Sequence, residues 1–434
     1  MTQTITPEIR NAPSAALHAS PDSLLQRSGT TAGVRNALWV PAVNAMLSSR
    51  VRSSRDRADQ ILAGIEAAAV RHTRADGPVD EGFRAGMRVL LAAYLEVDEL
   101  TPLGLFGVKT EIRRRVEMRL RVRRLLAEHP EIEDVPVRQP VVITGLPRTG
   151  TTFLHDMISC SESVRAPRLW ELLRPCPADG SARLRSSDRR RRIRSARVVT
   201  GVAHSAVPGL RVVHDISARA TEECVFMLPH SLVHNVPAPI PAYRRWYADR
   251  DATADYAYFK QLLQVLQWRC PERRWVLKSP FHLWSLDALL TVFPDATVIW
   301  THRAPETVMA SWCSLVEHIR ALHTCRTDPL RVGREWLRIW DSALRRAACA
   351  REMADPERFC DVDYQALTGD PAAVVASLAE RLGISAPRVL APRHQPDQRT
   401  ERLGRHRYSL ERYGLRVSEV RERLCIGRPS LAAR

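Results

Sequence analysis

Short runs of β-branched and aromatic residues alternate with amphipathic stretches from residue 139 onward. These apolar runs are 141–143, 275–277, 297–300 and 358–363. A Gly-, Pro- or Ser-containing turn or a tyrosine follows each run, and apolar residues then recur at helical spacing. Strands that alternate with helices in this way are typical of a parallel sheet with right-handed crossovers. The pattern therefore predicts an α/β fold of three layers, with a central parallel sheet flanked by helices.

The chain before the first apolar run has a different pattern. Residues 1–36 are rich in Ser, Thr, Pro and Ala and have weak periodicity, which is typical of a flexible arm. Apolar stripes at helical spacing then follow, and prolines mark the approach to the first strand. We therefore expect a flexible arm at 1–36, a helical extension at 37–138 and an α/β domain at 139–434.

Two segments carry dense positive charge, residues 110–127 and 181–198. The first is predicted to be a basic amphipathic helix, which usually has a solvated face and can also lie on a membrane surface. The second is expected to be a solvated surface, with an acidic partner as the alternative. No apolar run approaches the roughly 18 residues of a membrane span, so no transmembrane segment is expected.

The formal net charge of +17 is high enough to suggest a nucleic-acid partner. Only three of the 65 basic residues are Lys, however, and no helix-turn-helix, zinc or RNP pattern accompanies the arginines. We therefore expect no nucleic-acid partner and keep nucleic-acid binding as a rival hypothesis. The nine cysteines have no paired or metal-ligand spacing and no secretory signal is visible, which favours a cytoplasmic protein without a metal site.

The segment with the clearest chemistry follows the first strand and reads Gly145-Leu-Pro-Arg-Thr-Gly-Thr-Thr152. A strand, a glycine-bracketed loop and a helix N-terminus direct backbone N–H groups and a positive dipole at one point, which favours an anion. The loop residues expected to hold it are Arg148, Thr149, Gly150, Thr151 and Thr152. This makes the expected fold P-loop-like, although Thr151 stands where a nucleotide kinase or hydrolase has its Lys. Such an enzyme remains the alternative function.

Two further cations follow later strands. Lys278 comes after the run 275–277, and Arg303 comes after 297–300. Ligands of parallel α/β sheets bind outside the carboxyl ends of the strands. We therefore expect Arg148, Lys278 and Arg303 to lie at one edge of the sheet and to surround one anionic ligand.

These motifs resemble those of sulfotransferases that use 3′-phosphoadenosine 5′-phosphosulfate (PAPS). The segment 145–152 resembles the 5′-phosphosulfate loop of that family. Arg303, with Ser311 on the next helix, resembles the 3′-phosphate site, and Lys278 resembles the Lys that contacts the sulfuryl group. The match extends over about 110–415 and resembles a bacterial branch with a helical N-terminal extension. Two departures are Pro280, where a cytosolic branch has its catalytic His, and a missing Arg-Lys-Gly run, for which Arg405 and Arg407 are weak candidates.

The resemblance implies an enzyme that transfers a sulfuryl group from PAPS to a hydroxyl or amine, without a metal. The acceptor is left open as a small molecule, a lipid or a carbohydrate, as are peripheral membrane contact and the oligomeric state. Three residues are candidates for the base: Glu171, which resembles the catalytic Glu of the tyrosylprotein branch, His214 and His282. Tyr364 resembles the adenine-side Tyr of the family.

Overall fold

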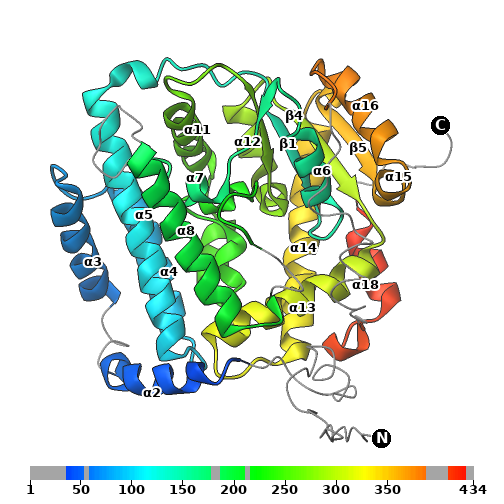
Figure 1. Cartoon of the computed structure of the whole chain (residues 1–434). Helices are drawn as coiled ribbons and strands as arrows, with labels where there is room; N and C mark the ends of the chain where they lie inside the picture. The colour runs from blue at the N-terminus through cyan, green and yellow to red at the C-terminus, as the bar shows by residue number, and fades with distance from the viewer. Residues whose placement is uncertain (1–35, 53–57, 177–185, 211–215, 388–408, 427–434) are drawn as a thin grey trace, which may run out of the picture. The chain divides into compact units, whose positions relative to one another are not determined.

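The computed structural model describes residues 36–52, 58–176, 186–210, 216–387 and 409–426 (Figure 1). Residues 34–434 belong to one compact unit. The predicted arm at 1–36 lies, but for its last residue, outside the described residues.

The predicted helical extension is present as four helices, α2 (Trp39–Arg52), α3 (Ala58–Thr73), α4 (Glu81–Leu95) and α5 (Pro102–Glu128). Side chains that precede two of them cap their first turns, since Asp80 accepts a hydrogen bond from Phe83 N and Thr101 accepts one from Gly104 N. These helices share one hydrophobic core with one face of the sheet. The boundary at residue 138 therefore marks a change of secondary structure within one packed unit.

The sheet has five parallel strands, β1 (Val141–Gly145), β2 (Val164–Arg165), β3 (Arg274–Lys278), β4 (Thr297–His302) and β5 (Phe359–Asp363). Their order is β2-β3-β1-β4-β5, with β1 in the centre. In register, Ile143 lies opposite Lys278 on one side and Gly145 opposite Thr301 on the other. The loop after β1 therefore lies between the ends of β3 and β4.

The two faces of the sheet belong to two different cores, because successive side chains of a strand point to opposite faces. Val141 and Ile143 pack with α6, α15 and α16, whereas Val142 packs with the larger core that contains α11 to α14 (Figure 1). This is the predicted three-layer α/β fold. In the described residues after β1, the α-helices are α6 (Thr151–Ile158), α7 (Leu169–Leu173), α8 (Ser186–Ala206), α10 (Pro241–Ala248), α11 (Thr253–Gln267), α12 (Leu286–Val292), α13 (Pro305–His323), α14 (Pro329–Glu352), α15 (Tyr364–Gly369), α16 (Pro371–Leu382) and α18 (Val417–Leu424).

The prediction that the basic helix has a solvated face is wrong for part of α5. Arg115 is only 3% exposed; it pairs with Glu111 at 2.8 Å and donates to the carbonyl of Leu228. This side of α5 faces the segments around residues 173 and 226–228, and Arg114 and Arg115 donate to main-chain carbonyls there. In the second basic segment, residues 181–185 lie outside the described residues. From Arg189 to Arg197 the arginines of α8 are solvated as expected, except for the buried Arg192.

Candidate functional site

The loop after β1 has the left-handed backbone that an anion cradle requires. Gly145, Arg148 and Gly150 all have positive φ, at 140°, 68° and 87°. A Cβ atom on Gly145 would lie 2.5 Å from the Thr301 carbonyl oxygen, so only glycine fits beside β4. Arg148 has no such freedom, and backbone strain of this kind is concentrated at functional sites.

Hydrogen bonds of threonine hydroxyls connect this loop to β4. Thr149 is buried; its Oγ1 donates to the Leu146 carbonyl at 2.6 Å and lies 2.6 Å from Thr301 Oγ1. Thr301 in turn donates to the carbonyl of Thr144 at 3.2 Å. Thr149 is one of the residues predicted to bind the anion. Its hydroxyl makes hydrogen bonds that stabilise the conformation of the loop.

Lys278, at the end of β3, is fully buried beside the first turn of α6. Its Nζ donates to Thr152 Oγ1 at 3.3 Å and pairs with Glu223 Oε1 at 3.1 Å. Burial alone would lower the pKa of the ammonium, but the charges of Glu223 and Glu222 outweigh it and raise the pKa above its ordinary value. Lys278 is therefore a permanent positive charge at the loop.

A second cluster joins Arg148, Arg303, Ser311 and Tyr364. Arg303 Nη1 donates to the carbonyl of Arg148 at 2.9 Å, and its guanidinium lies 3.9 Å from the centre of the Tyr364 ring. Arg148 Nε donates to Ser311 Oγ on α13 at 3.1 Å. A Cβ atom on Gly150 would lie 3.1 Å from Tyr364, so the tyrosine also packs against the loop. Residues from β1, β4, α13 and α15 thus meet at the carboxyl edge of the sheet.

Two of the three candidate bases lie within the described residues, and their surroundings differ. Glu171, on α7, is 7% exposed and uses both oxygens, accepting from Arg165 Nη2 and from Arg168 N at 2.9 Å each. His282 lies in the core next to Tyr256, and burial lowers its pKa to about 3. His214 lies outside the described residues, as do Arg405 and Arg407.

Glu223 is a site residue that the sequence pattern did not identify. In the sequence, Thr221 followed by Glu222 and Glu223 is typical of a helix start, and this interpretation is wrong. Thr221 forms a β-bridge with Arg168, and only a single 3₁₀ turn follows, at Cys224–Phe226. The side chain of Glu223 is 20% exposed, so it borders both the buried ammonium and open space. Two adjacent carboxylates, Glu222 and Glu223, were the only signal in the sequence.

Residues 140–388, which contain this whole edge of the sheet, match the sulfotransferase family. The chain belongs to the sulfotransferase family. The predicted family resemblance and the predicted transferase activity class are thereby confirmed. Within the described residues, no cluster of three or more His, Cys, Asp and Glu side chains could hold a metal ion. No helix in the described ranges is long and apolar enough to cross a membrane.

The sulfotransferase has relatives among mycobacterial proteins. It is 26% identical over 271 residues to omega-hydroxy-beta-dihydromenaquinone-9 sulfotransferase Stf3 of Mycobacterium bovis and of Mycobacterium tuberculosis. The match covers 58% of this chain and 64% of the relatives, so the chain spans slightly less than two thirds of their length.

Two solved sulfotransferases share the fold. Sulfotransferase STF1 from Mycobacterium tuberculosis H37Rv has a TM-score of 0.71 and 32% identity, over 83% of this chain and 97% of that chain. STF9 from Mycobacterium avium has a TM-score of 0.70 and 26% identity, over 84% and 94%. This coverage is larger than residues 140–434 could supply, so the likeness extends into the part of the chain before β1.

Proposed function

We propose that this sulfotransferase transfers the sulfuryl group of PAPS to a hydroxyl of a lipid-like acceptor. The observation that carries the proposal is the position of three cations, Arg148, Lys278 and Arg303, which follow β1, end β3 and follow β4. Three positive charges at the carboxyl edge of one sheet match a donor with a phosphosulfate at one end and a phosphate at the other.

In this proposal the loop 145–152 binds the 5′-phosphosulfate, with its backbone N–H groups and the N-terminus of α6 directed at the anion. Thr151 and Thr152 begin that helix. Arg303 and Ser311 bind the 3′-phosphate, and Tyr364 lies on the adenine side. The contact between Arg148 and Ser311 supports this arrangement, because it couples the two anion sites at 3.1 Å.

The reaction is an in-line displacement at sulfur, in which positioning and charge stabilisation do most of the work. The acceptor oxygen forms a bond to sulfur while the bond from sulfur to the 5′-phosphate oxygen breaks. Lys278 and Arg148 stabilise the negative charge that develops on the departing phosphate. The donor leaves as 3′-phosphoadenosine 5′-phosphate, and the proton of the acceptor passes to a carboxylate.

We assign that carboxylate to Glu223, with Glu171 as the alternative. Glu223 contacts the ammonium that serves the leaving group, so a base at this position is next to the reacting atoms. The two oxygens of Glu171 are already engaged by Arg165 and by the first turn of α7. A capping role for Glu171 is consistent with those contacts.

We infer the chemical class of the acceptor by analogy with the Stf3 relatives. The name of the Stf3 relatives states that they act on a hydroxylated dihydromenaquinone, a molecule with a long apolar chain. We propose an acceptor of the same general kind, an alcohol with a large apolar part.

A cytoplasmic location remains a prediction from the sequence. The nine cysteines are all free thiols, which is consistent with a reducing compartment.

The proposal is tested with labelled PAPS and a panel of hydroxylated lipids, phenols and sugars. Transfer of label to a lipid alcohol, without added metal and lost in Arg148→Ala, is the expected result. Release of phosphate from ATP·Mg²⁺ with no use of PAPS would instead support the kinase or hydrolase alternative.

A further inference from the structure

A cavity of about 750 Å³ lies between α5 and α8, on a different part of the chain from the loop after β1. Its walls come from Phe106 to Arg121 on α5, Leu173 to Cys176 after α7, and Arg191 to Ala203 on α8. A volume of this size lies within the range of small-molecule binding pockets. Nothing in the proposed PAPS site uses it.

The mouth of this cavity is unusually apolar for a surface. Phe106, Val198, Val199 and Val202 all line it and are 60%, 61%, 55% and 49% exposed. These four are among only ten large hydrophobic side chains that are exposed in the described part of the chain. An exposed apolar patch that surrounds a cavity marks a binding site for an apolar molecule.

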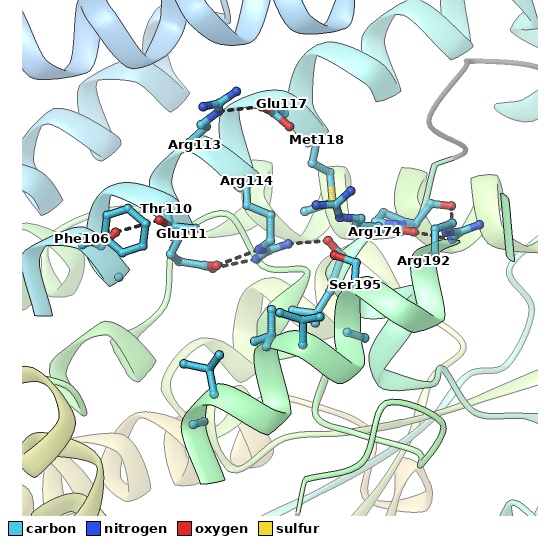
Figure 2. Close-up of a pocket in the computed structure, with 18 of the residues that line it drawn as sticks. Phe106, Thr110, Glu111, Arg113, Arg114, Glu117, Met118, Arg174, Arg192 and Ser195 are labelled. Carbon is cyan, nitrogen blue, oxygen red and sulfur yellow. Dashed lines mark hydrogen bonds and ion pairs between the residues drawn. The ribbon is translucent and has the colours of Figure 1, made fainter. Parts of the chain in front are cut away.

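The polar groups of the walls are largely paired with one another. Figure 2 shows two arginine–glutamate pairs along α5, Arg113 with Glu117 at 2.8 Å and Arg114 with Glu111 at 2.7 Å. Arg174 is different, since burial and the neighbouring charges of Arg121 and Arg191 lower its pKa. The cavity thus has apolar side chains along α8 and arginine side chains beside them. This combination suits an amphipathic ligand.

Arg114 connects this cavity to the proposed reaction centre. Its Nη1 donates to the Leu173 carbonyl at 2.9 Å, and its Nη2 donates to the Phe226 carbonyl at 3.0 Å. Phe226 is three residues after Glu223, so their Cα atoms are separated by at most about 11 Å along the chain. One wall residue of the cavity, Arg114, is therefore hydrogen-bonded to the segment that carries the proposed base.

We propose that this cavity binds the apolar part of the acceptor, an amphipathic alcohol whose hydroxyl reaches Glu223. The inference rests on the proposed function and adds to it where the acceptor binds and what it is. The cavity holds the chain of the alcohol along α8, while the hydroxyl end extends past Leu173 toward the end of β3.

The test uses the full chain and a series of straight-chain primary alcohols as probes, with binding measured by titration calorimetry. Each added methylene is expected to tighten binding by roughly fourfold until the cavity is filled. Val199→Asp puts a charge on the apolar mouth and is expected to weaken binding of the longer alcohols at least tenfold, by roughly the cost of burying an unpaired polar group.

Val417→Asp is the matched control, because Val417 is 42% exposed on α18 and does not line the cavity. This control is expected to bind the alcohols as the unmodified protein does, and both variants are expected to bind 3′,5′-ADP normally. An affinity that does not depend on chain length, or equal alcohol binding by the two variants, would overturn the proposed cavity. Failure of the unmodified protein to bind 3′,5′-ADP would contradict the proposed function instead, whatever the alcohols do.

Discussion

Glu223 accepts a hydrogen bond at 3.1 Å from the fully buried ammonium of Lys278, 55 residues further along the chain. Together with Glu222, this carboxylate outweighs the cost of burying the ammonium and raises the pKa of Lys278 at the end of β3. The same carboxylate is partly exposed. In the proposed mechanism this pair supplies both a cation for the leaving group and a base for the acceptor.

Replacing Glu223 with Gln is expected to lower kcat by roughly 10²–10⁴-fold, the usual contribution of a general base. Gln retains an oxygen that can accept from Lys278, and Glu222 still supplies negative charge beside the ammonium, so the affinity for 3′,5′-ADP is expected to change little. Steady-state rates and calorimetry of the same preparation measure the two effects separately.

Glu171→Gln is the comparison for this prediction. We expect it to cost about 1 kcal/mol of stability, because the single oxygen of Gln can accept from only one of Arg168 N and Arg165, with kcat nearly unchanged. A large loss of kcat in Glu171→Gln, with normal turnover by Glu223→Gln, would make Glu171 the base.

Arg148→Ala is expected to reduce turnover by about 10²–10³-fold, because one preorganised donor to the developing negative charge is removed. Its initial rate with saturating PAPS is the measurement. Arg345→Ala is the control, since Arg345 is exposed and pairs with Asp341 on the surface of α14. Equal rates for the two variants would exclude a catalytic role for Arg148.

Gly145→Ala is expected to destabilise the protein by about 1–3 kcal/mol. The new Cβ would lie 2.5 Å from the backbone oxygen of Thr301, at a φ of 140°, and the loop would have to move away from β4. Gly369→Ala, where nothing lies within 4 Å, is expected to be neutral or slightly stabilising. Urea unfolding of both variants tests this, and equal midpoints would contradict the close approach.

The stability that Asp361 contributes is expected to depend on pH. Asp361 binds Arg351 through both oxygens and lies 2.6 Å from His302 Nε2, next to Arg303. Burial opposes ionisation, but Arg351 and His302 lower the pKa of Asp361 from 3.8 to about 2. The folded protein thus binds this proton less readily than the unfolded chain, so the stabilisation is full above about pH 4 and disappears toward pH 2.

Asp361→Asn is therefore expected to lose at least about 2 kcal/mol at neutral pH. The difference from the unmodified protein is expected to shrink as the pH falls below about 4. Unfolding free energies measured at several pH values check this. A difference that stays constant down to the acid limit would mean that the carboxylate charge is not responsible.

The strands of the sheet could be predicted from the sequence because each is encoded by a short run of neighbouring residues. The β-branched runs at 141–143 and 297–300 are strands, as the local pattern predicts. The rule that ligands bind at the carboxyl edge of parallel strands was sufficient to predict a common location for Arg148, Lys278 and Arg303.

The rest could not be predicted because it depends on packing between distant segments. Glu223 meets Lys278 only after the chain between them has folded, and its own surroundings suggested a helix. Arg115 is part of a strongly basic segment, yet it is buried against the main chain at Leu228 and Pro229, more than 110 residues away in the sequence. The cavity between α5 and α8 likewise arises from two helices whose sequences give no sign that they are neighbours.

We propose that Arg303 and the loop after β1 bind the two ends of one donor. Calorimetry with 3′,5′-ADP and 5′-AMP tests this arrangement most directly. We expect the unmodified protein to bind 3′,5′-ADP without Mg²⁺, and roughly 10- to 100-fold more tightly than 5′-AMP, because charged hydrogen bonds to the 3′-phosphate are strong. Arg303→Ala is expected to abolish that preference. Equal affinity of the unmodified protein for both nucleotides, or tighter binding of ATP·Mg²⁺, would contradict the account.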